Sequence, residues 1–179
     1  MIEIMSTLEP LLAGLKPTTR NFAAGEYLFH RGDAVGVLHV VREGEAHLVR
    51  HQAGGAALVL QRAGPGAVLA EASLFSRRYH CDAIAATPLQ TQAVRIAALL
   101  ARLREDGAAA QAWLRHLAGE MQAARQRAEM LALRGVRARL DAWLAGGDGA
   151  LPAKGAWKAL AAELAVTPEA LYREIARRR

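Results

Sequence analysis

Short apolar runs separated by turn residues fill the part of the chain between residues 17 and 96. Several short strands at this spacing predict an antiparallel sandwich or barrel. Glycine is common in the turns because many tight turns require a positive φ. The predicted strands are residues 27–29, 37–41, 46–49, 57–60, 83–86 and 92–96. The turns between them are Ala24-Gly25, Arg31-Gly32-Asp33, Glu43-Gly44, Gly54-Gly55 and Gly64-Pro65-Gly66.

On both sides of this region the apolar positions follow a helical period. Leu8, Leu11, Leu12 and Leu15 predict a short helix within residues 1–16. After the strands, Asp106-Gly107 and Gly135 are expected to interrupt helices, and the four residues from Gly146 form a flexible connection. The predicted later helices are residues 97–104, 108–133 and 136–144.

The longest of these helices, residues 108–133, carries an apolar seam on one side. Its positions recur at alternating spacings of three and four, which is the a/d pattern of a coiled coil. A β-domain of roughly 80 residues covers only part of so long a helix, so we expect a parallel homodimer; the alternative is packing on the chain's own sandwich. The seam residues are Leu114, Leu117, Met121, Ala124, Ala128 and Leu131.

Residues 156–179 predict two short helices joined by a tight turn. An apolar stripe that includes Trp157 and Leu164 marks the first helix, and Ala165-Val166 forms the turn. Thr167 is a good N-cap for the second helix, and Pro168 suits the first helical position because its missing N–H costs nothing there.

The exposed side of the second helix is suited to reading DNA. Leu171 and Ile175 face the first helix, which leaves Glu169, Ala170, Tyr172, Arg173 and Ala176 outside. Such a helix fits the major groove, where Arg173 can bond guanine and Glu169 can accept from cytosine. We assign phosphate contacts to Thr167 and to the terminal residues Arg177, Arg178 and Arg179; an ordinary helical hairpin with a charged surface is the alternative.

The distribution of charge also indicates that the C-terminal half of the chain binds nucleic acid. The 179 residues carry a formal net charge of +6. Residues 1–100 hold 9 Lys and Arg against 8 Asp and Glu, whereas residues 101–179 hold 14 against 9. Clustered cations suit a polyanion, because neutralised phosphates release counterions. A solvated surface that only aids solubility is the alternative.

Composition also limits the class of protein. Hydrophobic residues make up 53% of the chain, enough for a buried core. No apolar run has the length of a membrane span, and residues 1–6 contain no basic residue of a signal peptide. A single cysteine, Cys81, excludes an internal disulfide. We therefore expect a cytoplasmic protein without a membrane partner.

Taken together, the segments resemble the Crp/Fnr family of catabolite-activator-like transcription regulators. In the N-terminal part the resemblance rests on residues 25–29, Arg31-Gly32-Asp33, 41–46 and 64–66, and on Leu69-Ala70-Glu71-Ala72-Ser73-Leu74-Phe75. In the C-terminal part it rests on residues 160–169. The resemblance spans residues 20–179.

The resemblance implies an α+β fold in three parts. Residues 1–106 would form an antiparallel β-roll sensor domain of the cyclic-nucleotide-binding jelly-roll type. Residues 107–134 would form the dimerisation helix, and residues 135–179 a helix-turn-helix DNA-binding domain. The implied partners are double-stranded DNA and a second copy of the chain, with RNA polymerase as a further candidate. A signal would act by shifting a hinge at residues 133–135.

The effector pocket departs from the pattern of family members that bind cyclic AMP. Those members hold the ribose with a Gly-Glu pair and the cyclic phosphate with an Arg-Ser pair. Here Glu71 remains, but Ala70 replaces the glycine, and Cys81-Asp82 replaces the Arg-Ser pair. An aspartate repels a phosphate, and the bidentate arginine is gone. We therefore expect no cyclic-AMP binding of the usual kind, unless Arg77 or Arg78 reaches inward.

Other effector chemistries find little support. The adenine-contacting hydroxyl pair of the family corresponds to Ala124-Arg125. The cysteines of the iron–sulfur branch are missing, and His80-Cys81 fits an exposed histidine beside a small buried cysteine on a strand better than it fits haem. No basic partner for a redox-active Cys81 is identifiable from the sequence. We expect no cofactor and no metal.

Two rival readings remain. Family members continue past the recognition helix into a β-hairpin wing, whereas this sequence stops at Arg179, so the wing is either lost or cut off. A ligand-binding or interaction dimer that has lost DNA binding is therefore the alternative function. An enzyme is disfavoured, because a cupin metal site needs a His-x-His pair. No such pair occurs among His30, His39, His47, His51, His80 and His116.

Overall fold

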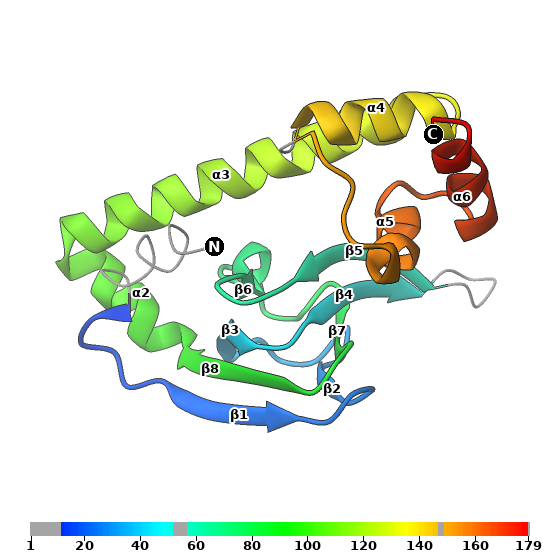
Figure 1. The fold of residues 1–179 in the computed structure, drawn as a ribbon. Helices are drawn as coiled ribbons and strands as arrows, with labels where there is room; N and C mark the ends of the chain where they lie inside the picture. The colour runs from blue at the N-terminus through cyan, green and yellow to red at the C-terminus, as the bar shows by residue number, and fades with distance from the viewer. Residues whose placement is uncertain (1–11, 52–56, 147–148, 179) are drawn as a thin grey trace. The chain divides into compact units, whose positions relative to one another are not determined.

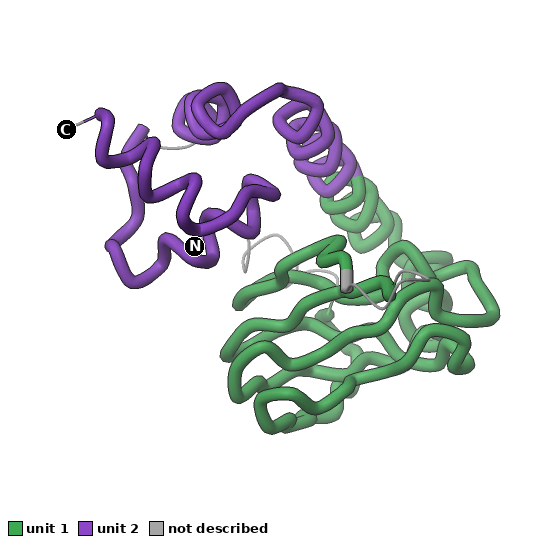
Figure 2. Tube along the Cα trace, turned by 90° about the vertical axis from the view of Figure 1, so that its right-hand side faces the viewer, with its two compact units in different colours: residues 1–117 green, residues 118–179 purple. Residues whose placement is uncertain are grey.

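The computed structural model describes residues 12–51, 57–146 and 149–178. Most of the predicted N-terminal helix, the Gly54-Gly55 turn, Gly147-Asp148 and Arg179 lie outside these ranges. The described chain divides into two compact units, residues 1–117 and 118–179, shown in green and purple in Figure 2.

The first unit contains two four-stranded antiparallel sheets (Figure 1). One sheet has the order β1-β8-β3-β6 and the other the order β2-β7-β4-β5. The strands of the first sheet are β1 (Thr18–Phe22), β8 (Leu89–Arg95), β3 (Val37–Glu43) and β6 (Val68–Leu69). Those of the second are β2 (Tyr27–Phe29), β7 (Asp82–Ala85), β4 (Ala46–His51) and β5 (Ala57–Ala63).

The alternation of side chains along β3 separates two hydrophobic clusters. Val41 belongs to the cluster that also contains Phe29 and Leu48 from the other sheet, so this cluster lies between the sheets. Leu38 and Val40 belong instead to the cluster of Leu99 and Trp113, on the opposite face of β3. Because strand side chains alternate between faces, one strand contributes to both clusters, and the outer one anchors the helices that follow β8.

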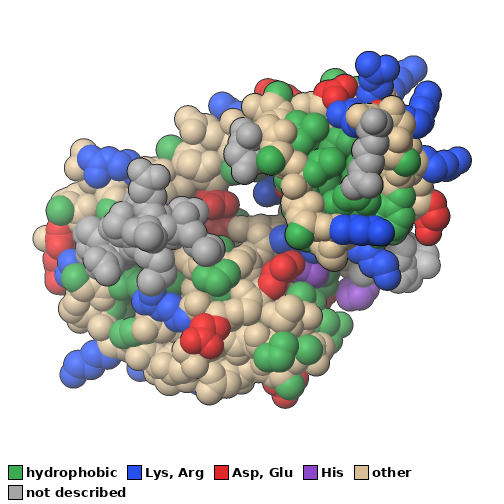
Figure 3. All heavy atoms as spheres, in the orientation of Figure 1, with side chains coloured by type: hydrophobic (Ala, Val, Ile, Leu, Met, Phe, Trp, Pro, Cys, Tyr) green, Lys and Arg blue, Asp and Glu red, His purple; other side chains and the backbone are tan. Residues whose placement is uncertain are grey.

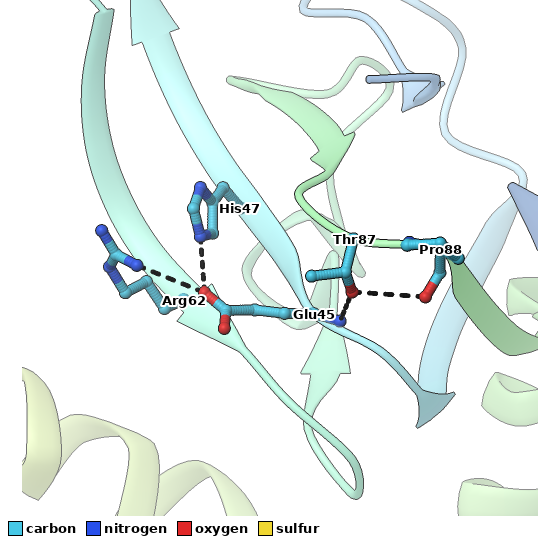
Figure 4. Close-up of polar contacts among 5 residues, drawn as sticks. All are labelled: Glu45, His47, Arg62, Thr87 and Pro88. Atoms are coloured by element: carbon cyan, nitrogen blue, oxygen red, sulfur yellow. Dashed lines mark hydrogen bonds and ion pairs between the residues drawn. The ribbon is translucent and has the colours of Figure 1, made fainter. Parts of the chain in front are cut away.

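The turn between β3 and β4 shows why glycine is required at one position. Gly44 has a φ of +81°, and a Cβ there would overlap the carbonyl oxygen of Pro88. Beside it, Thr87 Oγ1 accepts the Glu45 N–H at 2.8 Å and donates to Pro88 O at 3.2 Å (Figure 4). The Glu45 carboxylate lies 2.6 Å from His47 Nε2 and 3.3 Å from Arg62 Nη1. These contacts fix the start of the β4–β5 hairpin.

Helices follow the last strand. They are α2 (Ile96–Glu105), α3 (Gly107–Ala132), α4 (Val136–Gly146), α5 (Trp157–Glu163) and α6 (Pro168–Ala176), with short 3₁₀ turns η1 (Glu71–Ser73) and η2 (Lys154–Ala156). Asp106 begins α3: its carboxylate accepts the N–H groups of Ala108 and Ala109, and the bond to Ala109 is the main cause of its lowered pKa. This is the stabilising geometry for an acidic residue at a helix N-terminus.

The predicted α+β architecture is confirmed, with several corrections to its elements. Each predicted strand lies at an observed one, but β8 begins at Leu89, three residues earlier than predicted. The strands β1 and β6 were not predicted. Four of the five residues of β1 are exposed, and β6 has two residues, so neither shows the apolar alternation on which the prediction depended.

Candidate functional site

The first candidate site is the region where related cyclic-nucleotide-binding proteins hold their effector. Ala70 is buried directly after β6, with a φ of 75°. An L-residue in this left-handed conformation is strained, whereas the glycine of the family pattern would not be. Glu71 begins η1. Ala70 thus adopts a conformation that a glycine would adopt without strain.

Cys81, which the family resemblance places at the phosphate-binding arginine position, faces the interior. It is 2% exposed, in the cluster between the sheets with Phe29 and Leu48. Burial raises the pKa of its thiol, so neutral thiol is favoured over reactive thiolate. His80 beside it is exposed, with Nδ1 3.0 Å from Ser73 Oγ. The prediction of an exposed histidine beside a buried cysteine is confirmed, but both residues precede β7 rather than lie on a strand.

Asp82, which the family resemblance places at the phosphate-binding serine position, is buried, with a backbone N–H and two histidine rings near its carboxylate. Its Oδ1 accepts the backbone N–H of Arg31 at 2.9 Å. His30 Nδ1 lies 3.4 Å from the carboxylate, and His51 Nε2 lies 3.9 Å from it. A carboxylate placed here adds negative charge where an anion would have to bind. The sequence reading did not identify His30 and His51 as neighbours of Asp82, because their proximity follows from strand pairing.

The two arginines that could have replaced the missing one do not point inward. Arg77 and Arg78 are both exposed, and Arg78 Nη1 donates to Gly32 O at 2.6 Å. A third arginine, Arg50 on β4, was not predicted to take part. Its positive charge acts on Cys81, and its Nη2 donates to His80 O at 3.5 Å. Arg50 is therefore a basic side chain close to Cys81.

Within the described residues, no group of three or more His, Cys, Asp or Glu side chains is arranged to hold a metal ion. No helix in those ranges is long and apolar enough to cross a membrane.

The seam of α3 is largely exposed. Leu114 is 66% exposed and Met121 is 51% exposed. Ala124, Ala128 and Leu131 are exposed as well, together with Arg125, whose proposed role is in the effector pocket. Leu117 differs, since it packs against the cluster of Leu38 and Trp113. The described chain therefore leaves most of this predicted interface uncovered.

The second candidate site is formed by α5 and α6. Thr167 is the N-cap of α6, with its Oγ1 accepting the N–H of Ala170 at 3.2 Å, and Pro168 follows at the first turn. Leu171 and Ile175 are buried in a cluster with Trp157 and Leu164. The expected N-cap and the expected inward face are therefore confirmed.

The opposite face of α6 carries charged and aromatic side chains. Glu169, Tyr172 and Arg173 are exposed, as predicted, while Ala170 is only partly exposed. Arg177 has 81% of its side chain exposed. Figure 3 shows Lys and Arg side chains gathered over the end of the chain that carries α4 and α6. This face can therefore present hydrogen-bond donors, an acceptor and positive charge together.

Arg178 has a different environment from Arg177. Its guanidinium lies 2.8 Å from Asp141 on α4 and 3.1 Å from Glu174, and it donates to Arg137 O at 3.3 Å. Glu174 is buried, which the sequence reading did not anticipate. The arginine thus joins α6 to α4, and of the two arginines Arg177 is the one presented to solvent.

Comparison with known proteins agrees with this geometry. Residues 19–106 match the family of cyclic nucleotide-binding domains. No curated protein matches the sequence. Among solved structures, the N-terminal domain of a transcriptional regulator from Streptomyces coelicolor A3(2) is 27% identical, with a TM-score of 0.53, covering 70% of this chain and 94% of that one.

Two longer structures extend the similarity to the C-terminal helices. FixK2 from Bradyrhizobium japonicum is 18% identical, with a TM-score of 0.75, covering 91% of this chain and 84% of that one. The CRP-family transcriptional regulator TTHB099 from Thermus thermophilus is 23% identical, with a TM-score of 0.65, covering 88% and 83%. Residues 19–106 are therefore similar to cyclic nucleotide-binding domains, and the chain as a whole is similar in fold to Crp/Fnr-type transcription regulators.

Proposed function

We propose that this protein is a DNA-binding transcription regulator that acts as a homodimer and does not respond to cyclic AMP. The observation that carries the proposal is the α5–α6 pair. Its second helix buries Leu171 and Ile175, is capped by Thr167, and leaves Glu169 and Arg173 on an exposed face. A helix presented in this way fits the major groove.

The exposed groups divide into base-reading and phosphate-binding roles. Arg173 can make a bidentate contact to guanine, and Glu169 can accept from the amino group of cytosine. The Thr167 hydroxyl oxygen already accepts a backbone N–H, so its own proton can be donated to a phosphate. Arg177 supplies a charged phosphate contact, while Arg178 acts mainly by holding α6 against α4.

Two copies would pair through the exposed seam of α3. Pairing places one α6 from each protomer on the same duplex, so the target is an approximate palindrome with half-sites about one helical turn apart. A dimer binds more tightly than a monomer, because once one α6 has bound its half-site the second α6 binds as part of the same complex. RNA polymerase is a further candidate partner of such a complex.

The experiment is a fluorescence anisotropy titration with the protein's own upstream DNA. Arg173→Ala should weaken specific binding by about 1–3 kcal/mol and relax the preference at one base pair of each half-site. Arg104→Ala, which removes an equal charge from an exposed position of α2, serves as the matched control and should have little effect. No binding at low salt would favour an interaction dimer that has lost DNA binding.

A further inference from the structure

The three residues that join α3 to α4 are exposed, while Met130 before them and Val136 after them pack in the cluster that contains Leu164 and Leu171. The helix α3 ends at Ala132 and α4 begins at Val136. Between them, Leu133, Arg134 and Gly135 are all exposed, and Gly135 has a φ of +86°. Glycine adopts this conformation without strain, so Gly135 does little to fix the angle of the joint, which depends on the cluster around Met130 and Leu140 and on polar contacts.

The turn between α5 and α6 is irregular as well. Ala165 has a φ of 50°, which costs an alanine free energy that glycine would not lose. The Ala165 N–H donates to Ala162 O, and the Val166 N–H donates to Ala161 O. This pair of bonds is a Schellman motif, which leaves the carbonyl groups of Leu164 and Ala165 pointing outward for another donor.

Arg139 on α4 donates to both irregular segments at once. Its Nε donates to Leu133 O at 2.9 Å, and its Nη2 donates to Leu131 O at 3.1 Å. Its Nη1 donates to Leu164 O and to Ala165 O, each at 3.0 Å. One guanidinium thus satisfies four carbonyl oxygens that lie at the ends of α3 and α5, where helices leave acceptors without partners.

We propose that Arg139 is a positioning residue that locks the joint between α3 and the α5–α6 pair. Rotation about Gly135 would separate the carbonyls of Leu131 and Leu133 from those of Leu164 and Ala165. Both pairs of hydrogen bonds cannot survive that movement, because the guanidinium is a planar fork of fixed geometry. Together with the cluster that contains Met130 and Leu171, the lock holds the orientation of α6 relative to the end of α3.

The functional meaning of this lock rests on the proposed function. In a DNA-binding dimer, the end of α3 determines where each α6 is held, so the lock determines the spacing of the two reading helices. A signal that acts through the joint must break or preserve the Arg139 bonds as a set. The joint then has two discrete states instead of a continuous range of angles.

Arginine is required because no other side chain can make this set of contacts. Lysine keeps the positive charge, but all three of its donors are on one nitrogen atom. It therefore cannot donate to carbonyl groups on both segments at once, as the three nitrogens of the guanidinium do. Arg139→Lys is therefore the diagnostic variant. Arg134→Lys is the matched control, since Arg134 lies in the same joint and is exposed.

Hydrogen exchange followed by mass spectrometry on the full chain tests the proposal. In Arg139→Lys, peptides that report the amides of Leu133 and Val166 should both exchange at least about fivefold faster than in the wild type. This is the effect expected from the net loss of about one hydrogen bond. Exchange within β3 and β8 should not change, and Arg134→Lys should match the wild type. Unchanged exchange at either segment, or an equal rise throughout α3 to α6, would overturn the lock.

A second measurement connects the lock to the spacing of half-sites. Wild-type protein should prefer one spacing among duplexes that differ in it, and Arg139→Lys should lose most of that preference while keeping its salt dependence, because no charge has been removed. If the wild type bound no duplex, the proposed function would fail, yet the exchange result would still decide the role of Arg139.

Discussion

His39 shows how one residue in the sheet interior makes the stability of the roll depend on pH. Its ring lies near those of Phe22 and Phe29, and its Nδ1 is 3.0 Å from the hydroxyl of the buried Thr91. Burial, and secondly the charge of Arg20, lower its pKa from 6.5 to about 4. Folding therefore keeps this imidazole neutral at pH values where the unfolded chain would protonate it.

This shift predicts a loss of stability in mild acid. Between pH 6.5 and pH 4 the unfolded state binds more protons at His39 than the folded state, so the free energy of unfolding falls as the pH falls. The contribution of His39 to the free energy of unfolding is fully present above the pKa of the unfolded state. It falls by about 2–3 kcal/mol between about pH 7.5 and about pH 4.5. Urea titrations at both pH values measure it. His39→Gln should remove that part of the slope; an unchanged slope would assign it to other groups.

At the same scale, the sequence identifies residues whose role depends on near neighbours in the chain. Thr167 was predicted as an N-cap because the cap, the proline and the helix are consecutive. The environment of Asp82 was not predictable, since His30 and His51 approach it from other strands. Arg139 escaped notice for a similar reason: its acceptors lie up to 26 residues away, and no local pattern marks them.

At the scale of elements, α3 was predicted to within one residue at each end, because its apolar spacing is long and regular. The same regularity could not show that Leu117 packs on the roll's outer cluster while its seam neighbours do not. That difference depends on where the cluster of Leu38 and Trp113 ends. The strand β1 was missed because four of its five residues are exposed, so its sequence shows no apolar alternation.

The exposed seam predicts a dimer that one charge can weaken. Met121 is exposed at the centre of the seam, and a charge there would have to be buried against its copy in a parallel pair. Met121→Glu should shift the equilibrium toward monomer by at least about tenfold in sedimentation velocity, because desolvating an unpaired carboxylate costs several kcal/mol. Gln122→Glu, also on α3 but outside the seam, provides the control. A wild type that is monomeric at all concentrations would exclude the dimer altogether.

At the scale of the whole molecule, the fold of a cyclic-nucleotide regulator is combined with a changed effector site. In the roll, Glu71 begins η1 and Ala70 before it has a φ of 75°. Cys81 fills the arginine position from within the hydrophobic cluster. Because Cys81-Asp82 stands where the resemblance expects an Arg-Ser pair, we expect DNA binding that is independent of cyclic AMP.

This expectation leads to a direct test on the intact protein. A cyclic phosphate would meet the Asp82 carboxylate without a bidentate arginine, so its charge would be poorly compensated. Isothermal titration with cyclic AMP should show no micromolar binding, and the anisotropy of the DNA complex should be the same with and without the nucleotide. Asp82→Ser removes the repulsion but restores no arginine, so it should still bind poorly. Micromolar binding by the wild type that Glu71→Ala abolishes would mean that another basic group, with Arg50 the nearest candidate, has taken over the phosphate.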